Sequence, residues 1–384
     1  MKVLVDGIVF QVARSGIARV WTSVLQLLVK YPRVQITMLD RGGCPHIPGV
    51  CRIAFPSYTG ANTPADSLMI ERIATDVGAD VFASSYYTSP LTIPTVLLIH
   101  DMIPELFGFD LSERGWQEKE IAISFARHYV CVSANTKADL LKFYPEISDD
   151  RVIVAHCGVD RSVFNPAASQ GLEELCRKHD LHRPYYLLVG SRGQDKGYKN
   201  ASILFKALRV LRDFPFDIVC FGGKAEIQKE YLAGLPANVT VRRLEFDDKE
   251  LACAYSGAQA LVFPSLYEGF GLPVVEAMAC GCPVITTRHG SLGEVSANAA
   301  EFVSGHNTEE MVNALKQVRE PARRAELIEL GFARSATFSW DTLAERLEIS
   351  LRIAAAERFV PQAKKFFEDW KRLRVIQAAV DTSL

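Results

Sequence analysis

Two glutamates with seven residues between them, Glu268 and Glu276, stand in the otherwise apolar run EGFGLPVVE. The preceding run QALVFPS predicts a strand, and Pro273 suits the first turn of a following helix because its missing N–H would have no partner there. Gly281 and Pro283 predict the end of that helix. The pattern therefore predicts strand, loop, helix and strand, with Glu268 in the loop and Glu276 in the first or second helical turn.

The start of this helix suits an anion with a diol beside it. Free N–H groups and the helix dipole favour negative charge there, and Gly269 and Gly271 let the backbone come close to a ligand. A carboxylate can accept two hydrogen bonds, which suits the vicinal hydroxyls of a ribose. Acidic residues in first turns also stabilise helices without any ligand, so Glu276 has a structural alternative. An anion beside a diol describes a nucleotide diphosphate sugar.

The segment E-GFGLPVV-E, followed by AMACGCPVITT, resembles the E-x7-E signature of the family-four retaining glycosyltransferases (group 1 type), which have the GT-B fold. VSANTKADLLKFYP, VIVAHCGVD, YYLLVGSRG, VLLIHDMIPELF and FSWDTLAERL extend the likeness over most of the chain. The resemblance implies that Glu276 holds the donor ribose hydroxyls and that Glu268 faces the donor sugar as a catalytic residue. It implies further donor contacts at Gly269, Phe270, Gly271 and Leu272.

Transfer from a nucleoside diphosphate develops negative charge on the leaving phosphate. The sequence has no convincing D-x-D motif, so we expect protein cations in place of a metal and no cofactor. Arg192 directly follows the strand YYLLVGS, and Lys199 begins the next helical pattern, in a strand-to-helix loop of the kind that binds ligands in α/β sheets. The resembled family places an Arg and a Lys on the diphosphate there. GYKN favours Lys199, and Lys196 is the alternative.

In the first half of the chain, His100 and Asp101 end the apolar strand TVLLI. The resemblance implies that His100 lies against the donor sugar and that Asp101 supports its orientation. Without the resemblance, the pair could equally satisfy each other and a loop backbone.

Weaker candidates lie in two other loops of the first half. Gly16, in VARSGIARVW, would let backbone amides approach the reacting region, although the family's turn usually has more glycines. Arg14 or Arg19 could contact an anionic acceptor. Ser85 and Tyr86 follow the strand DVFA and are acceptor-side candidates.

Short β-rich runs alternate with helical patterns, which predicts an α/β fold with parallel sheets covered by helices. The unit occurs twice, and Pro, Gly, Ser and Asn gather between Val159 and Pro184. We predict two Rossmann-like domains whose sheets face a central cleft, and C-terminal helices that cross back onto the first domain. The predicted ranges are 1–165 for the acceptor-side domain, 166–340 for the nucleotide-sugar domain and 341–384 for the C-terminal helices.

Charge and composition exclude some partners. Lys and Arg number 43 against 45 Asp and Glu, which argues against nucleic-acid binding. The opening residues lack signal-peptide features, and no apolar run approaches ~18 residues, so we expect a cytoplasmic protein. Nine scattered cysteines predict buried thiols, and the C-x-C at Cys280 and Cys282 predicts packing rather than metal binding. The basic segment PQAKKFFEDWKRLRVIQAA predicts a packed helix, with peripheral contact with the membrane's inner face as the alternative.

These observations together predict a hexosyltransferase that needs no metal, and the resemblance implies that it is a retaining enzyme. A front-face mechanism fits, because no carboxylate of the first half stands out as a general base. GYKN favours GDP-mannose over UDP-hexoses, and a glycan or lipid-linked saccharide is the expected acceptor. Closure of the two domains would exclude water and bring His100 and Glu268 together. A GT-B sugar-nucleotide epimerase and an inactive glycan-binding relative are the alternatives. An NAD enzyme is disfavoured because no G-x-G-x-x-G follows the first strand.

Overall fold

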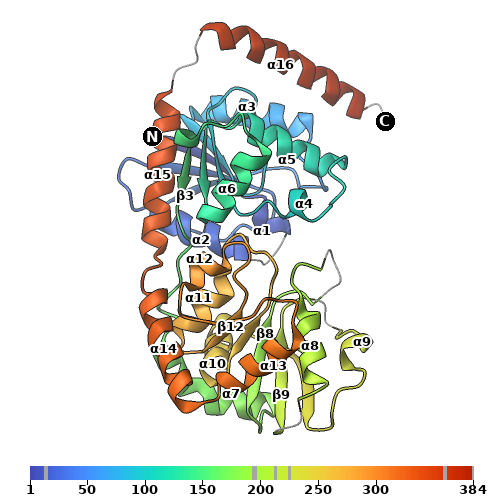
Figure 1. Ribbon diagram of the computed structural model, residues 1–384. Helices are drawn as coiled ribbons and strands as arrows, with labels where there is room; N and C mark the ends of the chain where they lie inside the picture. Colours follow the sequence, from blue (N-terminus) through green and yellow to red (C-terminus); the bar gives the residue numbers. More distant parts are fainter. Residues whose placement is uncertain (13–15, 193–196, 212–213, 224–225, 358–360, 383–384) are drawn as a thin grey trace. The chain divides into compact units, whose positions relative to one another are not determined.

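The computed structural model describes residues 1–12, 16–192, 197–211, 214–223, 226–357 and 361–382 (Figure 1). The chain divides into two compact units: Met1–His156 with Trp340–Leu384, and Cys157–Ser339. The first boundary therefore lies earlier than the predicted 165/166. Phe164 explains part of the difference, because it is 1% exposed and its ring lies 6.2 Å from that of Tyr255 in the second unit.

The N-terminal unit is built on a seven-stranded parallel sheet in the order β3-β2-β1-β4-β5-β6-β7. The strands are β1 Lys2–Asp6, β2 Gln35–Asp40, β3 Val50–Ala54, β4 Val81–Ser84, β5 Thr95–Ile99, β6 His128–Cys131 and β7 Val152–Val154. β4 and β5 are buried along their whole length, as expected of parallel strands covered on both faces. β3 was not predicted, because this edge strand is largely exposed and carries no continuous apolar run.

The helices of this unit cover the sheet and connect its strands. They are α1 Val9–Val12, α2 Gly16–Leu28, α3 Pro64–Val77, α4 Ile103–Leu106, α5 Arg114–Phe125 and α6 Ala134–Phe143. α3 begins at a capping box in which Thr63 and Asp66 bond each other's backbone N–H, and it ends at Gly78 with φ 65°. α5 ends at Phe125, and β6 begins three residues later at His128.

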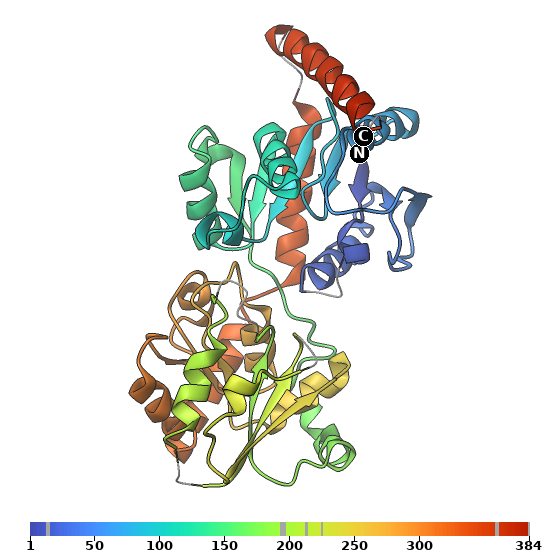
Figure 2. The same cartoon turned by 90° about the vertical axis from the view of Figure 1, so that its right-hand side faces the viewer.

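Two C-terminal helices, α15 Trp340–Ala356 and α16 Pro361–Asp381, belong to the same unit. α15 contacts α2 and strands β4 to β7 along one face of the sheet (Figure 2). α16 contacts α3, and its Trp370 ring stacks on Phe125 of α5 at 4.9 Å. None of the described helices is both long and apolar enough to cross a membrane.

The second unit is built on a six-stranded parallel sheet in the order β10-β9-β8-β11-β12-β13. Its strands are β8 Tyr185–Val189, β9 Phe216–Phe221, β10 Val239–Leu244, β11 Leu261–Phe263, β12 Val284–Thr286 and β13 Glu301–Phe302. Its α-helices are α7 Leu172–His179, α8 Ala201–Leu208, α9 Lys229–Leu232, α10 Asp248–Gly257, α11 Leu272–Ala279, α12 Leu292–Ser296, α13 Thr308–Gln317 and α14 Pro321–Ser335. The two-residue β13 was not predicted, because it is too short to show a pattern.

Both sheets reverse their strand order, between β1 and β4 and between β8 and β11. In open α/β sheets ligands bind beyond the carboxyl ends of the strands at such switch points. Tyr86 follows β4, and Arg192 and Glu268 follow β8 and β11. The topology therefore places several predicted site residues at these switch points.

Candidate active site

The start of α11 is shaped by Gly271. This residue caps the helix with φ 98°, a conformation that side chains disfavour, and a Cβ there would lie 3.0 Å from Leu292 Cδ2. Leu272 is the first helical residue, and Pro273 lies in the first turn as predicted. The helix therefore begins abruptly, with its first N–H groups beside the loop that carries Glu268, Gly269 and Phe270.

Close backbone packing holds this loop in place. A Cβ on Gly290 would lie 2.9 Å from both the backbone N and O of Glu268, so only glycine fits there. Ser291 N–H donates to Glu268 O at 3.1 Å, and Ser291 Oγ lies 2.9 Å from the carbonyl oxygens of Glu268 and Phe270. The Phe270 ring meets Phe338 edge to face at 5.4 Å. The loop is thus fixed before any ligand arrives.

Lys199 and Glu268 form a two-point ion pair. Lys199 Nζ lies 2.7 Å from Glu268 Oε1 and 2.8 Å from Oε2, and the side chains are 24% and 10% exposed. Asn200 orients the lysine loop, since it adopts φ 51° and its amide donates to Gly305 O at 2.8 Å and to Pro264 O at 3.2 Å. The structure therefore brings together two predicted site residues from different loops. Lys196 lies outside the described residues.

Arg192 is held at the end of β8 by a glycine pair. Its Nη1 donates to Gly222 O at 2.7 Å, and the side chain is buried. A Cβ on Gly223 would lie 3.0 Å from Gly190 O and from Ser191 Cα, so the loop after β9 packs directly on this segment. Tyr231 Oη donates to Arg192 O at 3.1 Å. The first contact holds the guanidinium, and the other two hold the backbone around it.

Glu276 lies in the second turn of α11 and is 3% exposed. Tyr255 of α10, which is fully buried, donates its hydroxyl to Glu276 Oε2 at 3.3 Å. The carboxylate is therefore positioned by a neighbouring helix as well as by its own.

In the N-terminal unit, His100 directly follows β5, and its buried imidazole is uncharged at neutral pH. Burial lowers the pKa of its imidazole to about 4, and its buried Nε2 has no hydrogen-bond partner within the described ranges. Asp101 Oδ1 accepts a hydrogen bond at 2.9 Å from the backbone N–H of Ile103, the first residue of α4. A neutral imidazole with one vacant ring nitrogen can hydrogen-bond a sugar hydroxyl without adding charge.

The weaker candidates have different surroundings. Gly16 is the first residue of α2, and Arg14 lies outside the described residues. Ser85 is buried, donates to Asp6 O at 2.6 Å and accepts from Val9 N at 3.0 Å, so its hydroxyl fixes the loop after β1. Tyr86 N–H donates to Ser84 Oγ at 3.2 Å, and the Tyr86 side chain lines a cavity.

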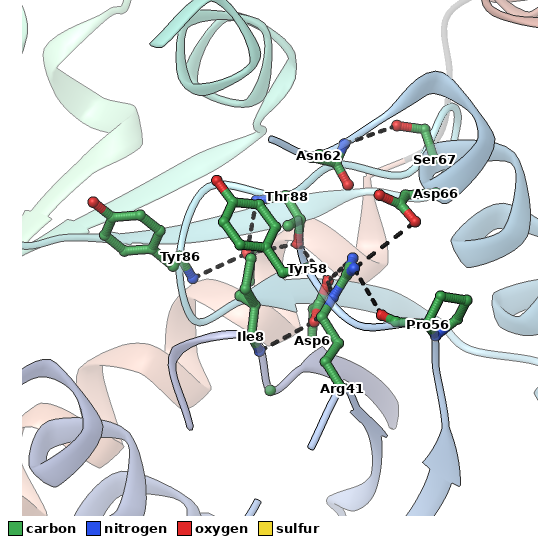
Figure 3. Close-up of polar contacts among 12 residues, drawn as sticks. Asp6, Ile8, Arg41, Pro56, Tyr58, Asn62, Asp66, Ser67, Tyr86 and Thr88 are labelled. Atoms are coloured by element: carbon green, nitrogen blue, oxygen red, sulfur yellow. Dashed lines mark hydrogen bonds and ion pairs between the residues drawn. The ribbon is translucent and has the colours of Figure 1, made fainter. Parts of the chain in front are cut away.

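The sequence did not predict a buried polar cluster at the end of β1 (Figure 3). Arg41 and Asp6 are 2% and 0% exposed and form an ion pair at 2.9 Å, and Thr88 Oγ1 donates to Asp6 Oδ2 at 2.8 Å. Arg41 also lies over the Phe55 ring at 4.4 Å. Asp6, the last residue of KVLVD, could have predicted this cluster, because a charged residue at the end of a buried strand needs a partner. The cluster fixes the loops at the switch point of the first sheet.

The cysteines were predicted to be buried thiols. All nine cysteines are free thiols, and six of them are buried. Across the described parts of the chain, no group of three or more His, Cys, Asp and Glu gathers to hold a metal ion.

Two family models match the chain, one in each half. Residues 183–320 match "Glycosyl transferases group 1", and residues 15–163 match "Glycosyltransferase Family 4". The chain is 30% identical over 68% of its length to alpha-maltose-1-phosphate synthase of Mycolicibacterium smegmatis, of which the alignment spans 74%. It is 38% identical over 59% of its length to O-antigen chain mannosyltransferase B of Escherichia coli, of which the alignment spans 61%.

The solved structure of Anabaena HepE in complex with UDP-glucose matches 92% of the chain and 99% of that structure, with a TM-score of 0.68 and 15% identity. The two parallel sheets in separate units, each with a strand-order switch, match this GT-B neighbour, which confirms the predicted α/β fold of the GT-B class. The chain belongs to the family 4, group 1 glycosyltransferases.

Proposed function

We propose that the protein is a retaining hexosyltransferase that moves mannose from GDP-mannose to a glycan or a lipid-linked saccharide, without a metal ion. The observation that carries this proposal is the Lys199 ammonium, held by both oxygens of Glu268 in the loop that leads to the glycine-capped start of α11. This arrangement offers a cation and helix N–H groups to a diphosphate, and a carboxylate to the sugar beside it.

In this proposal the charge of the leaving group is met by protein groups. A diphosphate at the start of α11 would compete with Glu268 for Lys199, and the buried Arg192 guanidinium would supply further positive charge. The Arg192 guanidinium is held by Gly222 O before the reaction, so little reorganisation of this cation is needed when charge develops on the phosphate. We therefore propose that the donor binds without magnesium.

Glu276 is proposed to hold the ribose hydroxyls of the donor, as the family resemblance implies. The assignment of mannose is supported by the 38% identity to O-antigen chain mannosyltransferase B. His100 is proposed to hydrogen-bond the donor sugar through its vacant Nε2. In the front-face mechanism the departing phosphate oxygen takes the acceptor's proton, so the protein need not supply a general base.

The test is thermal stabilisation of the full chain across a panel of nucleotide sugars, with and without EDTA. A ligand at ~100 times its Kd adds ~2.7 kcal/mol to stability, so GDP-mannose should raise Tm more than the UDP-hexoses do. EDTA should leave that shift unchanged. Absence of a shift with every donor would contradict the proposal, and conversion of a donor without acceptor would favour the epimerase alternative.

We also propose that α16 contacts an anionic membrane surface from the cytoplasmic side. Phe366, Leu373, Ile376 and Val380 are 46% to 61% exposed, and their spacing places them along one face of the helix. Lys365 and Arg372 are 84% and 81% exposed beside them. Apolar side chains flanked by cations suit the boundary of an anionic bilayer.

Sedimentation with vesicles tests the membrane proposal. Phosphatidylglycerol vesicles should bind the chain and phosphatidylcholine vesicles should not. Ile376→Ser with Leu373→Ser should abolish binding, whereas Met69→Ser, at another exposed apolar residue, should not. Equal binding of both lipids would contradict the charge requirement.

A further inference from the structure

A cavity of about 230 Å³ opens in the N-terminal unit, apart from the residues assigned to the donor. Three segments build it: the loop after β3, the loop after β4, and the start of α5. Its lining residues are Tyr58, Gly60, Asn62, Tyr86, Tyr87, Glu113, Gly115, Trp116, Glu118 and Lys119. The volume is below the ~300–1,000 Å³ typical of sites for drug-sized ligands, so it suits one ring better than a chain.

Asn62 gives the first sign of a ligand. Its side chain is 2% exposed, its Nδ2 lies 3.1 Å from Ser67 Oγ, and its Oδ1 has no partner within the described ranges (Figure 3). Ser67 Oγ could also donate to the amide, and turning the amide would then leave Nδ2 unpaired in place of Oδ1. In either orientation, one polar atom of this lining residue has no partner among the described residues. Because that atom has almost no exposed surface, a ligand hydroxyl would reach it only after a small rotation of the Asn62 side chain.

The walls are aromatic and carry hydroxyl groups. Tyr58, Tyr86, Tyr87 and Trp116 are among the lining residues, and aromatic rings of this kind pack against the C–H groups of sugars. Tyr58 Oη donates to Gly60 O at 2.7 Å, which leaves the oxygen able to accept. Burial raises the pKa of Tyr86 to about 12, so its phenol stays neutral and can donate. Apolar faces beside neutral donors and acceptors match a polyhydroxylated ring.

The charges around the cavity disfavour an anion. Lys119, the cation of the lining, is 3% exposed and lies 2.7 Å from Glu105. The nearby Arg374 of α16 donates to both oxygens of Glu118, at 2.8 and 3.1 Å, so its charge is also compensated. A phosphate in the cavity would meet Glu113 and Glu118 without a spare cation among the described lining residues, and a buried charge needs a partner.

The cavity shares its sheet edge with His100 and Asp101. Tyr86 and Tyr87 follow β4, which neighbours β5, and the negative charge of Asp101 contributes to the raised pKa of both tyrosines. A ligand in the cavity would thus lie on the same edge as the proposed sugar contact at His100.

We propose that this cavity binds one ring of an uncharged saccharide and is the site for the acceptor, in preference to a sugar phosphate. The acceptor role rests on the proposed transferase function, whereas the ligand class rests on the lining of the cavity alone.

The test is direct binding to the full chain without any donor. Methyl mannoside, methyl glucoside and methyl galactoside would be compared with mannose 6-phosphate and glucose 6-phosphate by saturation-transfer NMR and calorimetry. At least one neutral glycoside should bind, and both phosphates should bind more weakly. Asn62→Ala should weaken glycoside binding at least about tenfold, because a buried hydrogen bond is lost. Asn135→Ala on α6 is the matched control and should leave binding unchanged.

Tyr86→Phe removes one hydroxyl and should weaken glycoside binding even if the Asn62 variant fails to fold. Preferred binding of the phosphates, absence of neutral-sugar binding, or full affinity in folded variants at both positions would overturn the proposal. Donor stabilisation should be unchanged in both variants, which separates the two proposals. If neutral sugars bind through Asn62 but no nucleotide sugar stabilises the chain, the transferase function fails and the ligand class of the cavity stands.

Discussion

The proposed donor site of the second unit and the cavity of the first unit differ in how their charged and polar groups are paired. On the donor side, Lys199 and Glu268 compensate each other's charge in a partly exposed pair, which a diphosphate could open. Around the cavity, the ion pairs Lys119–Glu105 and Arg374–Glu118 are buried, and one amide atom of Asn62 is unsatisfied. The first arrangement suits an anion, and the second suits a neutral hydroxyl-bearing ring.

Arg192→Ala is expected to have the largest effect. Loss of a buried cation from the proposed leaving-group site should lower kcat by about 10²–10³-fold with a smaller change in donor KM. Steady-state kinetics with saturating acceptor measure it. Lys206→Ala on α8, an exposed lysine of the same unit, should retain activity. Full activity of the Arg192 variant would refute the charge assignment for this side.

His100 should make stability depend on pH. Its folded pKa of about 4 lies below the ordinary value of 6.5, so between these values the unfolded chain binds more protons. The free energy of unfolding therefore carries no penalty from His100 above pH 6.5 and falls as the pH falls towards 4. The slope is up to about 1.4 kcal/mol per pH unit, and the total loss is about 3 kcal/mol.

Urea unfolding at pH 7.5, 6 and 5 measures this slope. His100→Asn should flatten it, whereas His46→Asn, at an exposed histidine, should not. Identical slopes for the wild type and the His100 variant would show that the imidazole is not held neutral.

Glu276→Ala should weaken donor binding by about 10–100-fold, because each charged hydrogen bond to a ribose hydroxyl contributes about 1.5–3 kcal/mol. Calorimetric titration with the donor measures it. Tyr255→Phe removes the hydroxyl that positions the carboxylate and should weaken binding less. Neither change should alter glycoside binding to the N-terminal cavity, and a parallel loss there would break the separation between the two sites.

The smallest expected effect is the coupling between Lys199 and Glu268 in the absence of donor. Because the pair is partly exposed, a double-mutant cycle with Lys199→Met and Glu268→Gln should give a coupling of about 0.5–1 kcal/mol in the free energy of unfolding. Donor should reduce this coupling, since the diphosphate takes the lysine. A coupling that grows with donor would show that the pair stays intact in the complex.

The site at α11 was easier to predict than the cavity, because its residues lie in one short segment of the chain. Glu268, Gly271, Pro273 and Glu276 fall within one strand-loop-helix segment, and the structure places α11 where the turn signals predicted it. The acceptor candidates Ser85 and Tyr86 were chosen by position after a strand alone. Ser85 proves to fix the loop after β1, and only Tyr86 lines the cavity.

The sequence alone determined the alternation of buried strands and helices, the doubling of the α/β unit and the helix start at Gly271, because these depend on residues close together in the chain. The edge strands β3 and β13 were not predicted from the sequence, because too few of their residues are buried to produce an apolar pattern. Only the tertiary structure decided that Lys199 meets Glu268, that Asn62 is left with an unsatisfied atom, and that Arg374 neutralises Glu118. Those contacts join segments far apart in the chain, and their geometry depends on loop paths and helix packing that no local pattern encodes.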